Sequence, residues 1–331
     1  MSRNAPLRFL LSGGAGYIGS VTAAVLVEAG HTVAVLDNLV SGHREAVHPA
    51  ARFVAGDIAD RNAVAEACSG GIDVVMHFAA FIEVGESVRD PSKYYQNNVI
   101  GTVQFIDNLR EMGVERFVFS SSAAVYGEPK EIPLTEHAPL KPANPYGFTK
   151  LMVEQVLRDY AAAYRFRSVS LRYFNAGGAY HLYGEDHRPE SHLIPRILDA
   201  ALSGIPLRVF GDDYDTHDGS CIRDYVHVRD IAGAHVRAAE YLMEEGKTDS
   251  FNLGRDTGVT VMEVIRTAEE VTGKMIPYDI AGRRPGDSAV LVASSEKARH
   301  VLGWGHDLAP LEALISSAWE WRLKHLDGYQ S

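Results

Sequence analysis

Short apolar runs alternate with amphipathic stretches through the first half of the chain. Strands are predicted by runs rich in Val, Ile, Leu and Phe at 7–12, 32–37, 52–56, 73–78, 116–121 and 168–174. Between them, helical spacing of apolar residues occurs at 18–29, 60–68, 98–112 and 146–164. Strands that are apolar almost throughout are buried on both faces, so the pattern predicts an α/β fold built on a parallel sheet that helices cover.

The second half of the chain has a less regular pattern. Its features are, in order, a loop rich in Gly, Tyr, His and Pro at 177–189, a helix at 193–203, a polar hairpin-like segment at 208–223, a helix at 230–244, a short strand at 251–254, and helices at 261–272 and 310–325. We expect one domain over 1–176, to which segments near 225–254 return, and a smaller C-terminal α/β lobe over 177–331.

Composition and charge exclude several classes of protein. The 331 residues are 46% hydrophobic and 23% charged, which is typical of a globular chain with a large core. The net charge of −11, without a basic run, argues against a nucleic-acid partner. Cys68 and Cys221 are too sparse for a disulfide framework or a zinc site, and we expect no metal. No apolar run reaches the length of a signal peptide or a membrane span, so we expect a soluble cytoplasmic protein.

A glycine-rich turn directly follows the first apolar run and leads into the first helix. Gly13, Gly16 and Gly19 have the spacing G-x-x-G-x-x-G. Gly13 permits a tight turn, Gly16 lets the backbone approach a pyrophosphate, and Gly19 lets the helix pack closely. Phosphate charge would rest on the helix N-terminus. The turn therefore predicts a Rossmann-type doubly wound sheet that binds a dinucleotide, although a glycine turn without any ligand is the alternative.

An acidic residue at the end of the second run bears on the choice of dinucleotide. Asp37 lies 18 positions after Gly19 (37 minus 19). Its carboxylate can accept both ribose hydroxyls of an adenosine and would repel a 2′-phosphate, which favours NAD over NADP. The alternative is that Asp37 only begins the following turn.

The ends of the third and fourth runs supply further candidates. Asp57 and Ile58 follow the third run, and Phe78, Ala79 and Ala80 follow the fourth. Such carboxyl ends line the ligand crevice of open α/β sheets. Asp57 either hydrogen-bonds an adenine edge or caps a loop, and the two alanines either leave room for a cofactor or belong to the core.

Tyr146 and Lys150 lie about one helical turn apart, so a helix places them on one face. Asn144 can cap this helix and Pro145 suits its first turn, which puts the phenol near a positive helix end. Ionisation at neutral pH needs a fall in the phenol pKa of roughly 3 units, or about 4 kcal/mol, so a second cation is desirable. Ser122, at the end of the fifth run, is the hydroxyl expected across the same crevice. Taken alone, the pair is more typical of a helix surface.

This ordered set of residues resembles the extended short-chain dehydrogenase/reductase superfamily. Five further segments narrow the resemblance: Gly-Glu-Ser at 85–87, Tyr-Tyr-x-Asn-Asn at 94–98, Leu-Arg-Tyr-Phe-Asn at 171–175, Arg-Asp-Tyr-Val-His-Val at 223–228, and Arg-Arg-Pro-Gly-Asp at 283–287. Together they closely resemble the UDP-glucose 4-epimerase family over nearly the whole chain.

The resemblance implies which residues contact each ligand. For NAD, besides the glycines and the strand-end residues named above, it implies Tyr17, Ile18, Asn38, Asp57, Ile58, Asn97, Tyr146, Lys150 and Phe174. For the UDP-sugar it implies Ser122, Tyr146, Asn175, His192, Leu193, Arg223, Arg284, Asp287 and Leu291. Two arginines suit a diphosphate on an otherwise acidic protein, although each arginine is equally typical of a solvated surface.

The activity implied by the resemblance interconverts UDP-glucose and UDP-galactose through a transient 4-keto sugar. In this hypothesis Tyr146 removes the proton of the 4′-hydroxyl, Ser122 hydrogen-bonds the reacting oxygen, and hydride passes to and from tightly bound NAD. Related dehydratases and decarboxylases need acidic residues beside the serine, where this chain has Ala123 and Ala124. A noncatalytic NAD-binding regulator is the alternative from another class, but it would have no use for an activated phenol.

Departures from the family pattern leave the substrate open. Ser191 and His192 replace an asparagine pair, and Ile82 replaces a lysine near the nicotinamide of some members. Leu291 occupies a position where bulk is thought to restrict N-acetylated sugars, and its size lies between those of the known tyrosine and cysteine types. UDP-N-acetylglucosamine, UDP-glucuronate and UDP-arabinose therefore remain alternative substrates.

The resemblance also implies a homodimer that pairs through a four-helix bundle. The candidate helices are those at 98–112 and 146–164. Their apolar residues, such as Val153, Val156 and Leu157, are equally suited to packing on the sheet, and the sequence does not divide the two faces.

Overall fold

The central element of the computed structural model is a sheet of seven parallel strands in the order β11-β6-β5-β4-β1-β2-β3. The model describes residues 6–129, 131–284, 287–305 and 307–330, so Pro285 and Gly286 of the Arg-Arg-Pro-Gly-Asp segment lie outside the described residues. The sheet consists of β1 (Arg8–Ser12), β2 (Thr32–Asp37), β3 (Arg52–Ala55), β4 (Val74–His77), β5 (Arg116–Ser122), β6 (Arg167–Tyr173) and β11 (Asp249–Leu253). The strand order reverses between β1 and β4, which confirms the doubly wound Rossmann-type sheet.

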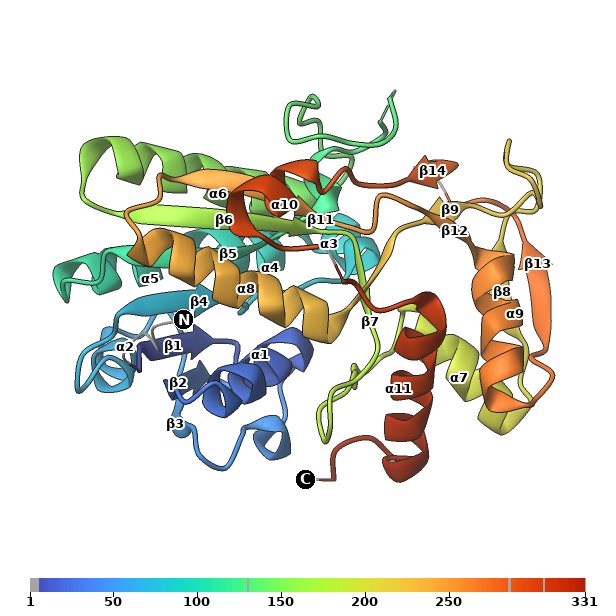
Figure 1. The fold of residues 1–331 in the computed structure, drawn as a ribbon, viewed down its shortest axis with the longest axis horizontal. Coiled ribbons are helices and arrows are strands. Elements are labelled where there is room, and N and C mark those ends of the chain that lie inside the picture. The colour runs from blue at the N-terminus through green and yellow to red at the C-terminus, as the bar shows by residue number, and fades with distance from the viewer. Residues whose placement is uncertain (1–5, 130, 285–286, 306, 331) are drawn as a thin grey trace.

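Helices cover both faces of this sheet, as Figure 1 shows. One face carries α1 (Tyr17–Glu28), α8 (Val228–Met243) and α10 (Glu296–Leu302). The other carries α2 (Arg61–Ala67), α5 (Thr102–Glu111) and α6 (Pro145–Ala163). Two elements from the second half of the chain thus join this domain, since α8 packs on the large sheet and β11 is one of its strands. The boundary at residue 176 stays a prediction.

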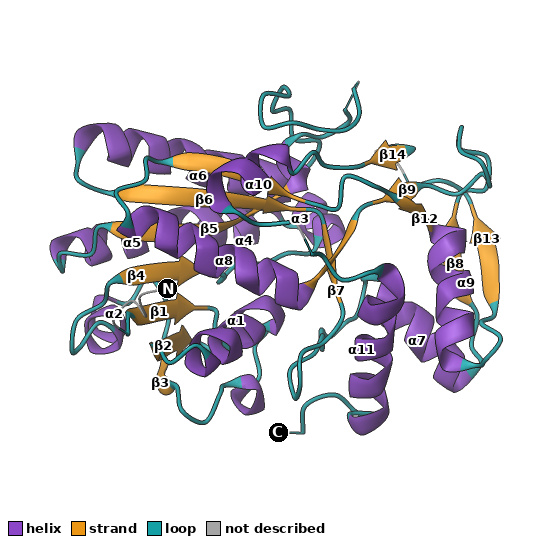
Figure 2. Cartoon of the chain, in the orientation of Figure 1, coloured by secondary structure: helices purple, strands orange, loops and turns teal. Residues whose placement is uncertain are grey.

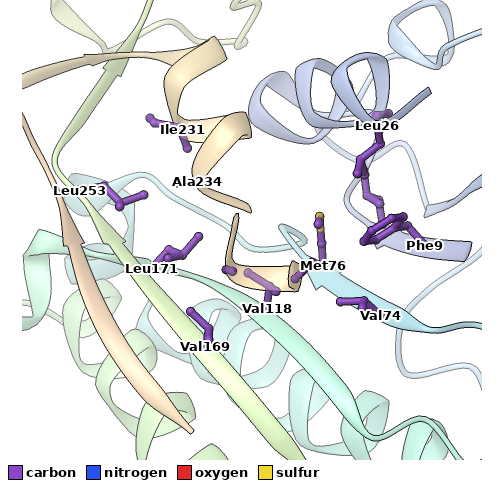
Figure 3. Packing of buried hydrophobic residues seen from close by; sticks show 14 of the residues in the cluster. Phe9, Leu26, Val74, Met76, Val118, Val169, Leu171, Ile231, Ala234 and Leu253 are labelled. Atoms are coloured by element: carbon purple, nitrogen blue, oxygen red, sulfur yellow. The ribbon is translucent and has the colours of Figure 1, made fainter. Parts of the chain in front are cut away.

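Alternation along the strands divides the core into two clusters. Phe9 and Leu11 face the cluster that includes α1 and α8, whereas Leu10, between them, faces the α2, α5 and α6 side. Figure 3 shows the first cluster, in which Met76 and Val118 lie among side chains from several strands and from α8. Each fully buried aliphatic side chain contributes roughly 1.5–3 kcal/mol to the stability of the fold.

A smaller lobe lies beside the carboxyl ends of the strands (Figure 2). Its helices are α7 (Leu193–Ser203), α9 (Val261–Thr272) and α11 (Leu311–Lys324), which share one apolar core. Its strands are β8 (Leu207–Phe210), β9 (Ile222–Arg223), β12 (Val259–Thr260), β13 (Tyr278–Ala281) and β14 (Val290–Leu291). A parallel pair of β7 (Asn175–Gly177) and β10 (Tyr225–His227) lies between the lobes.

The hairpin expected at 208–223 is wrong. Strand β8 pairs in parallel with β13, about 70 residues later, and β9 pairs with β12 and β14. The segment contains a local turn, which the Tyr214 N–H bond to the Gly219 carbonyl closes at 2.9 Å. Turn residues are the only signal that its sequence carries. The distant partner strands leave no signal in that segment.

The other expected strands and helices of both halves are present, with ends that differ by a few residues. The largest difference is at 98–112, where α5 is preceded by a π-helical turn, Tyr95–Gly101. Three short helices, α3 (Val84–Arg89), α4 (Pro91–Tyr94) and α10, are not predicted by the pattern because they span too few residues to show a period. Of the helices in the described ranges, none combines the length and apolar character that crossing a membrane requires.

A buried ion pair fastens α6 to the sheet. Arg172 on β6 donates from Nε to Glu154 Oε1 at 2.8 Å and from Nη2 to Glu154 Oε2 at 2.5 Å. The two side chains are 3% and 0% exposed. Ser121 on β5 donates to Glu154 Oε1 at 2.6 Å, and Arg172 Nη1 donates to the Tyr126 hydroxyl at 2.9 Å. One carboxylate therefore ties the helix to two neighbouring strands.

Replacing Glu154 by Gln is expected to lower the free energy of unfolding by about 3–5 kcal/mol, because it leaves the Arg172 guanidinium buried without its counter-charge. Urea denaturation measures the change. The matched control is Glu240→Gln, whose pair with Arg237 is 3.0 Å long but largely exposed, and we expect it to cost less than about 1 kcal/mol. Equal losses in the two variants would contradict this account.

Candidate active site

The glycine turn lies at the carboxyl end of β1, against the end of β4. Gly13 has φ +73°, and a Cβ there would lie 2.5 Å from the Ala79 nitrogen. A Cβ on Gly19 would lie 2.4 Å from the Gly13 carbonyl oxygen, so the tight turn and the close helix packing both require glycine. Gly16 precedes the first residue of α1 and, having no side chain, makes no capping hydrogen bond there. The turn therefore presents backbone N–H groups that suit a phosphate.

Asp37 ends β2 beside this turn and is buried. Its Oδ2 accepts the Ala15 N–H at 3.0 Å and its Oδ1 accepts the Leu39 N–H at 2.8 Å. Burial raises the pKa of the carboxyl, and the two N–H bonds oppose that rise. Asp37 thus begins the next turn and also holds the glycine turn, and its contact with a ribose stays a prediction.

The candidates on the loops after β2 and β3 bond to each other. Asn38 Nδ2 donates to Asp57 Oδ2 at 2.9 Å, and Asp57 Oδ1 accepts the Ala59 N–H at 2.9 Å. The loop-capping alternative for Asp57 is therefore observed, while contact with adenine stays a prediction. Ile58 is buried in the cluster beneath α2.

Residues after β4 line the crevice and are bonded to the end of β1. The N–H groups of Phe78 and Ala79 donate to the Ser12 carbonyl at 2.8 and 3.1 Å. Ala80 is half-buried at the same strand end. Asn97, in the π-helical turn, donates from Nδ2 to Asn98 Oδ1 at 2.8 Å.

Asn98 is a positioning residue that the sequence did not single out. It accepts the Phe81 N–H at 2.9 Å, donates to the Phe81 carbonyl at 2.9 Å, and donates to Thr149 Oγ1 at 3.3 Å. The buried amide thereby joins the loop after β4 to the first turns of α6. Only its place in the Tyr-Tyr-x-Asn-Asn segment signalled it in the sequence.

The start of α6 matches its sequence signals. Asn144 Oδ1 accepts the Gly147 N–H at 2.9 Å, and Pro145 occupies the first turn. A Cβ on Gly147 would lie 2.5 Å from the Ala124 carbonyl oxygen, so the helix approaches the end of β5 closely. Tyr146 consequently faces the strand end that carries Ser122.

Ser122, Tyr146 and Lys150 lie together at this junction. Ser122 lies near enough to the Tyr146 phenol to lower its pKa, and Ser122 Oγ accepts the Ala124 N–H at 3.1 Å. Lys150 is buried, its Nζ donates to the Ser120 carbonyl at 2.8 Å, and it lies 5.7 Å from the centroid of the Tyr146 ring. The three candidates from separate parts of the sequence thus form one cluster.

In the chain alone the pKa of the Tyr146 phenol is raised, and its ionisation with a second cation present stays a prediction. Burial raises the pKa of the phenol, the nearby Glu83 raises it further, and only Ser122 opposes the rise. Burial also lowers the pKa of Lys150 to about 7. Because both groups are removed from water, a phenolate needs a further cation, as expected from the sequence.

The substrate-side candidates gather around β7, β9 and β14. Asn175 Nδ2 donates to the Asp224 carbonyl at 3.0 Å. Arg223 Nη1 donates to the Ile222 and Ser288 carbonyls at 2.9 Å each, and its Nη2 lies 3.3 Å from Asp287 Oδ1. Pairing of β9 with β14 places Leu291 opposite Arg223.

The remaining substrate-side candidates differ from this group in exposure or in position. Arg284 is exposed, with its guanidinium carbon 3.9 Å from the centroid of the Phe210 ring. Arg223, in contrast, is half-buried and partly neutralised by Asp287, so the two arginines are not equivalent. His192 and Leu193 begin α7, and Phe174 packs with the cluster around Tyr126.

Comparison with known proteins extends over nearly the whole chain. A model of the NAD dependent epimerase/dehydratase family matches residues 9–254. The UDP-glucose 4-epimerase of Halalkalibacterium halodurans is 49% identical over 329 residues, covering 98% of each chain. That of Rhizobium leguminosarum bv. trifolii is 49% identical over 321 residues, 95% of this chain and 97% of its own.

Solved structures agree with these sequence matches. A crystal structure of a UDP-glucose 4-epimerase matches with a TM-score of 0.95 and 43% identity, covering 98% of this chain and 100% of its own. The UDP-glucose 4-epimerase from Brucella ovis, in complex with NAD, matches with a TM-score of 0.92 and 44% identity, covering 96% and 98%. With a fold, a glycine turn and matches of this extent, the chain belongs to the NAD-dependent epimerase/dehydratase family, among the UDP-glucose 4-epimerases.

Proposed function

We propose that this crevice inverts C4 of a UDP-hexose, interconverting UDP-glucose and UDP-galactose, with Tyr146 as the group that moves the proton. The observation that carries the proposal is the cluster of Ser122, Tyr146 and Lys150 at the end of β5. When bound, NAD would supply reversible hydride transfer at C4 of the sugar, which would pass through a 4-keto state. Because the same hydride would be returned to the other face, no nicotinamide would be consumed.

The residues at the glycine turn fit NAD. The backbone N–H groups at the start of α1 suit the pyrophosphate, because Gly16 has no side chain to cap them and leaves the approach open. The buried Asp37 carboxylate suits the adenosine ribose and disfavours a 2′-phosphate. The candidates Tyr17, Ile18, Phe78 and Asn97 lie on the elements that border this turn and the end of β4.

The residues of this chain contribute proton transfer, in a site that shields the phenol from water. As a phenolate, Tyr146 takes the proton of the 4′-hydroxyl while Ser122 hydrogen-bonds the reacting oxygen. Because burial raises the phenol pKa in the chain alone, the phenolate requires the charge of Lys150 together with that of the oxidised nicotinamide. Ala123 and Ala124 offer no second acid or base beside Ser122, which favours epimerisation over loss of water.

The UDP-sugar lies, in this proposal, between the start of α7 and strands β9 and β14. Arg223 and Arg284 would neutralise the diphosphate, while Asn175, His192, Leu193 and Asp287 would orient the nucleotide and the sugar. Leu291 is half-buried opposite Arg223 and would border the sugar. Its intermediate size keeps 4-epimerisation of an N-acetylated UDP-sugar as the second candidate.

Purified protein without added nicotinamide is expected to convert UDP-galactose to UDP-glucose, as followed by proton NMR of the C4 inversion. Tyr146→Phe is expected to lower kcat by about 10²–10⁴-fold, because the general base is lost. The control is Tyr160→Phe, on the same helix, whose hydroxyl donates to Asp107 at 3.0 Å. No inversion by the wild-type protein, or equal rates in the two variants, would overturn the proposal. UDP-N-acetylgalactosamine in the same experiment decides between the two substrate classes.

The pH dependence of kcat/KM tests the role of Lys150. Activity is expected to fall as the pH is lowered, because the phenolate takes up a proton. Lys150→Met is expected to move this fall to higher pH by about one unit or more, because removing a cation raises the phenol pKa. Lys274→Met, at a lysine 6.0 Å from the Trp319 ring in the smaller lobe, is the control. An acid limb that stays in place in Lys150→Met would exclude the lysine from this role.

We also infer that two copies pair through α6 and the π-helical turn. Phe148 and Met152, four residues apart on α6, are 41% and 43% exposed, and Ile100 on the adjoining turn is 45% exposed. Val153 and Leu157, in contrast, are buried in the cluster on the sheet, so they belong to the core. An exposed apolar stripe at helical spacing supports a helix-to-helix interface.

Light scattering during gel filtration is expected to show a dimer for the wild-type protein and a monomer for the Phe148→Lys/Met152→Lys double variant. Charges on the stripe would be desolvated on pairing, which opposes association. Met275→Lys, at a methionine that is 86% exposed in the smaller lobe, should leave the dimer intact. A monomeric wild-type protein, or a dimeric double variant, would refute this interface.

A further inference from the structure

Four side chains of the loop before α7 converge on one point. They are Glu185, His187, Glu190 and His192, and one ligand atom from each lies within 4.8 Å of the others. Their side chains are 8%, 18%, 15% and 40% exposed, respectively. Together they offer two imidazole nitrogens and two carboxylate oxygens, a donor set typical of zinc sites.

The spacing of these atoms fits a small cation. His192 Nδ1 lies 3.0 Å from Glu185 Oε1 and 3.0 Å from Glu190 Oε1. His187 Nδ1 lies 3.3 Å from Glu185 Oε1 and 3.5 Å from Glu190 Oε2. Ligands on a tetrahedral ion with bonds of about 2.0–2.1 Å are roughly 3.3–3.4 Å apart. These four separations span that value, and the remaining pairs of ligand atoms lie within 4.8 Å of one another.

An ion-pair network without a metal does not satisfy the whole cluster. Among the described residues, buried His187 Nδ1 has no partner in hydrogen-bonding geometry, although two carboxylate oxygens lie within 3.5 Å of it. The oxygens therefore lie outside the direction in which this nitrogen hydrogen-bonds, and a buried unpaired polar atom costs about 1–3 kcal/mol. A cation between the nitrogen and the oxygens would remove this cost.

Neighbouring backbone N–H groups already hold one of the four ligands in place. Glu190 Oε1 accepts the N–H groups of Ser191 and His192 at 2.7 Å each, which fixes the carboxylate at the start of α7. The ring of Tyr17 packs edge-on against His187, with centroids 6.4 Å apart. The same carboxylates raise the pKa of His187 to about 9, so a proton competes with a cation for this ring.

We propose that Glu185, His187, Glu190 and His192 bind one divalent transition-metal ion of the Zn²⁺ class. The ion would be structural, because it would brace the loop that connects the two lobes. Ser191, within the cluster, donates to Glu83 Oε2 at 2.7 Å and so joins this loop to the one after β4. This site shares His192 with the proposed UDP-sugar contacts, since Nδ1 would bind the ion and Nε2 stays available for a nucleotide.

Metal analysis tests the site. Protein free of any affinity tag is stripped with a chelator, mixed with equimolar Zn²⁺ at pH 8, desalted, and measured by mass spectrometry of the elements. The wild-type protein is expected to retain about one ion per chain, and His187→Gln and Glu185→Gln to retain far less. The control is His181→Gln, in the same loop, whose side chain is 63% exposed.

Two readouts keep the test decisive if one variant fails to fold. Thermal unfolding of the wild-type protein should shift upward on adding Zn²⁺, and that of Glu185→Gln should not. Co²⁺ in place of Zn²⁺ should give the intense visible absorption of a four-coordinate site in the wild-type protein. No retained zinc and no cobalt spectrum, or equal retention by His187→Gln, would show that the cluster is an ion-pair network only.

Discussion

A carboxylate–guanidinium pair that water does not reach joins α6 to strands β5 and β6, and the proposed site depends on it. Glu154 lies one helical turn beyond Lys150 and two turns beyond Tyr146, so all three occupy one face of α6. Its carboxylate binds Arg172 on β6 and Ser121 on β5, next to Ser122. Burying two charges is costly, and a bidentate pair with further hydrogen bonds offsets that cost only in one geometry. The register of the helix against the strand ends follows from this constraint.

The same burial determines what the site can do without a ligand. The phenol pKa of Tyr146 is raised and the ammonium pKa of Lys150 is lowered to about 7, because both groups are held away from water. A neutral phenol beside a weakly basic lysine removes no protons at neutral pH. In this account a positively charged nicotinamide completes the electrostatics, so the base becomes active where the hydride acceptor is present. Proton transfer and hydride transfer are thereby coupled by charge.

The parts of the fold and site that were predictable depend on local sequence signals. Buried parallel strands appear as apolar runs, the turn at Gly13 needs glycine, and the cap at Asn144 and the spacing of Tyr146 and Lys150 are local to one helix. The features that the sequence did not show depend on distant contacts or on burial. The pairing of β8 with β13 and the raised phenol pKa have no local signature, and the convergence of the loop around His187 appears only in three dimensions.

The ionisation of Tyr146 with and without NAD tests the central claim most directly. Tyrosines labelled with carbon-13 at Cζ report phenol ionisation by NMR, and the Tyr146→Phe spectrum assigns the resonance. The account predicts a phenol pKa above the ordinary value of about 10 in the NAD-free protein and a pKa lower by several units in the NAD⁺-loaded protein. The same pKa in both forms, or a pKa already lowered without NAD, would contradict it.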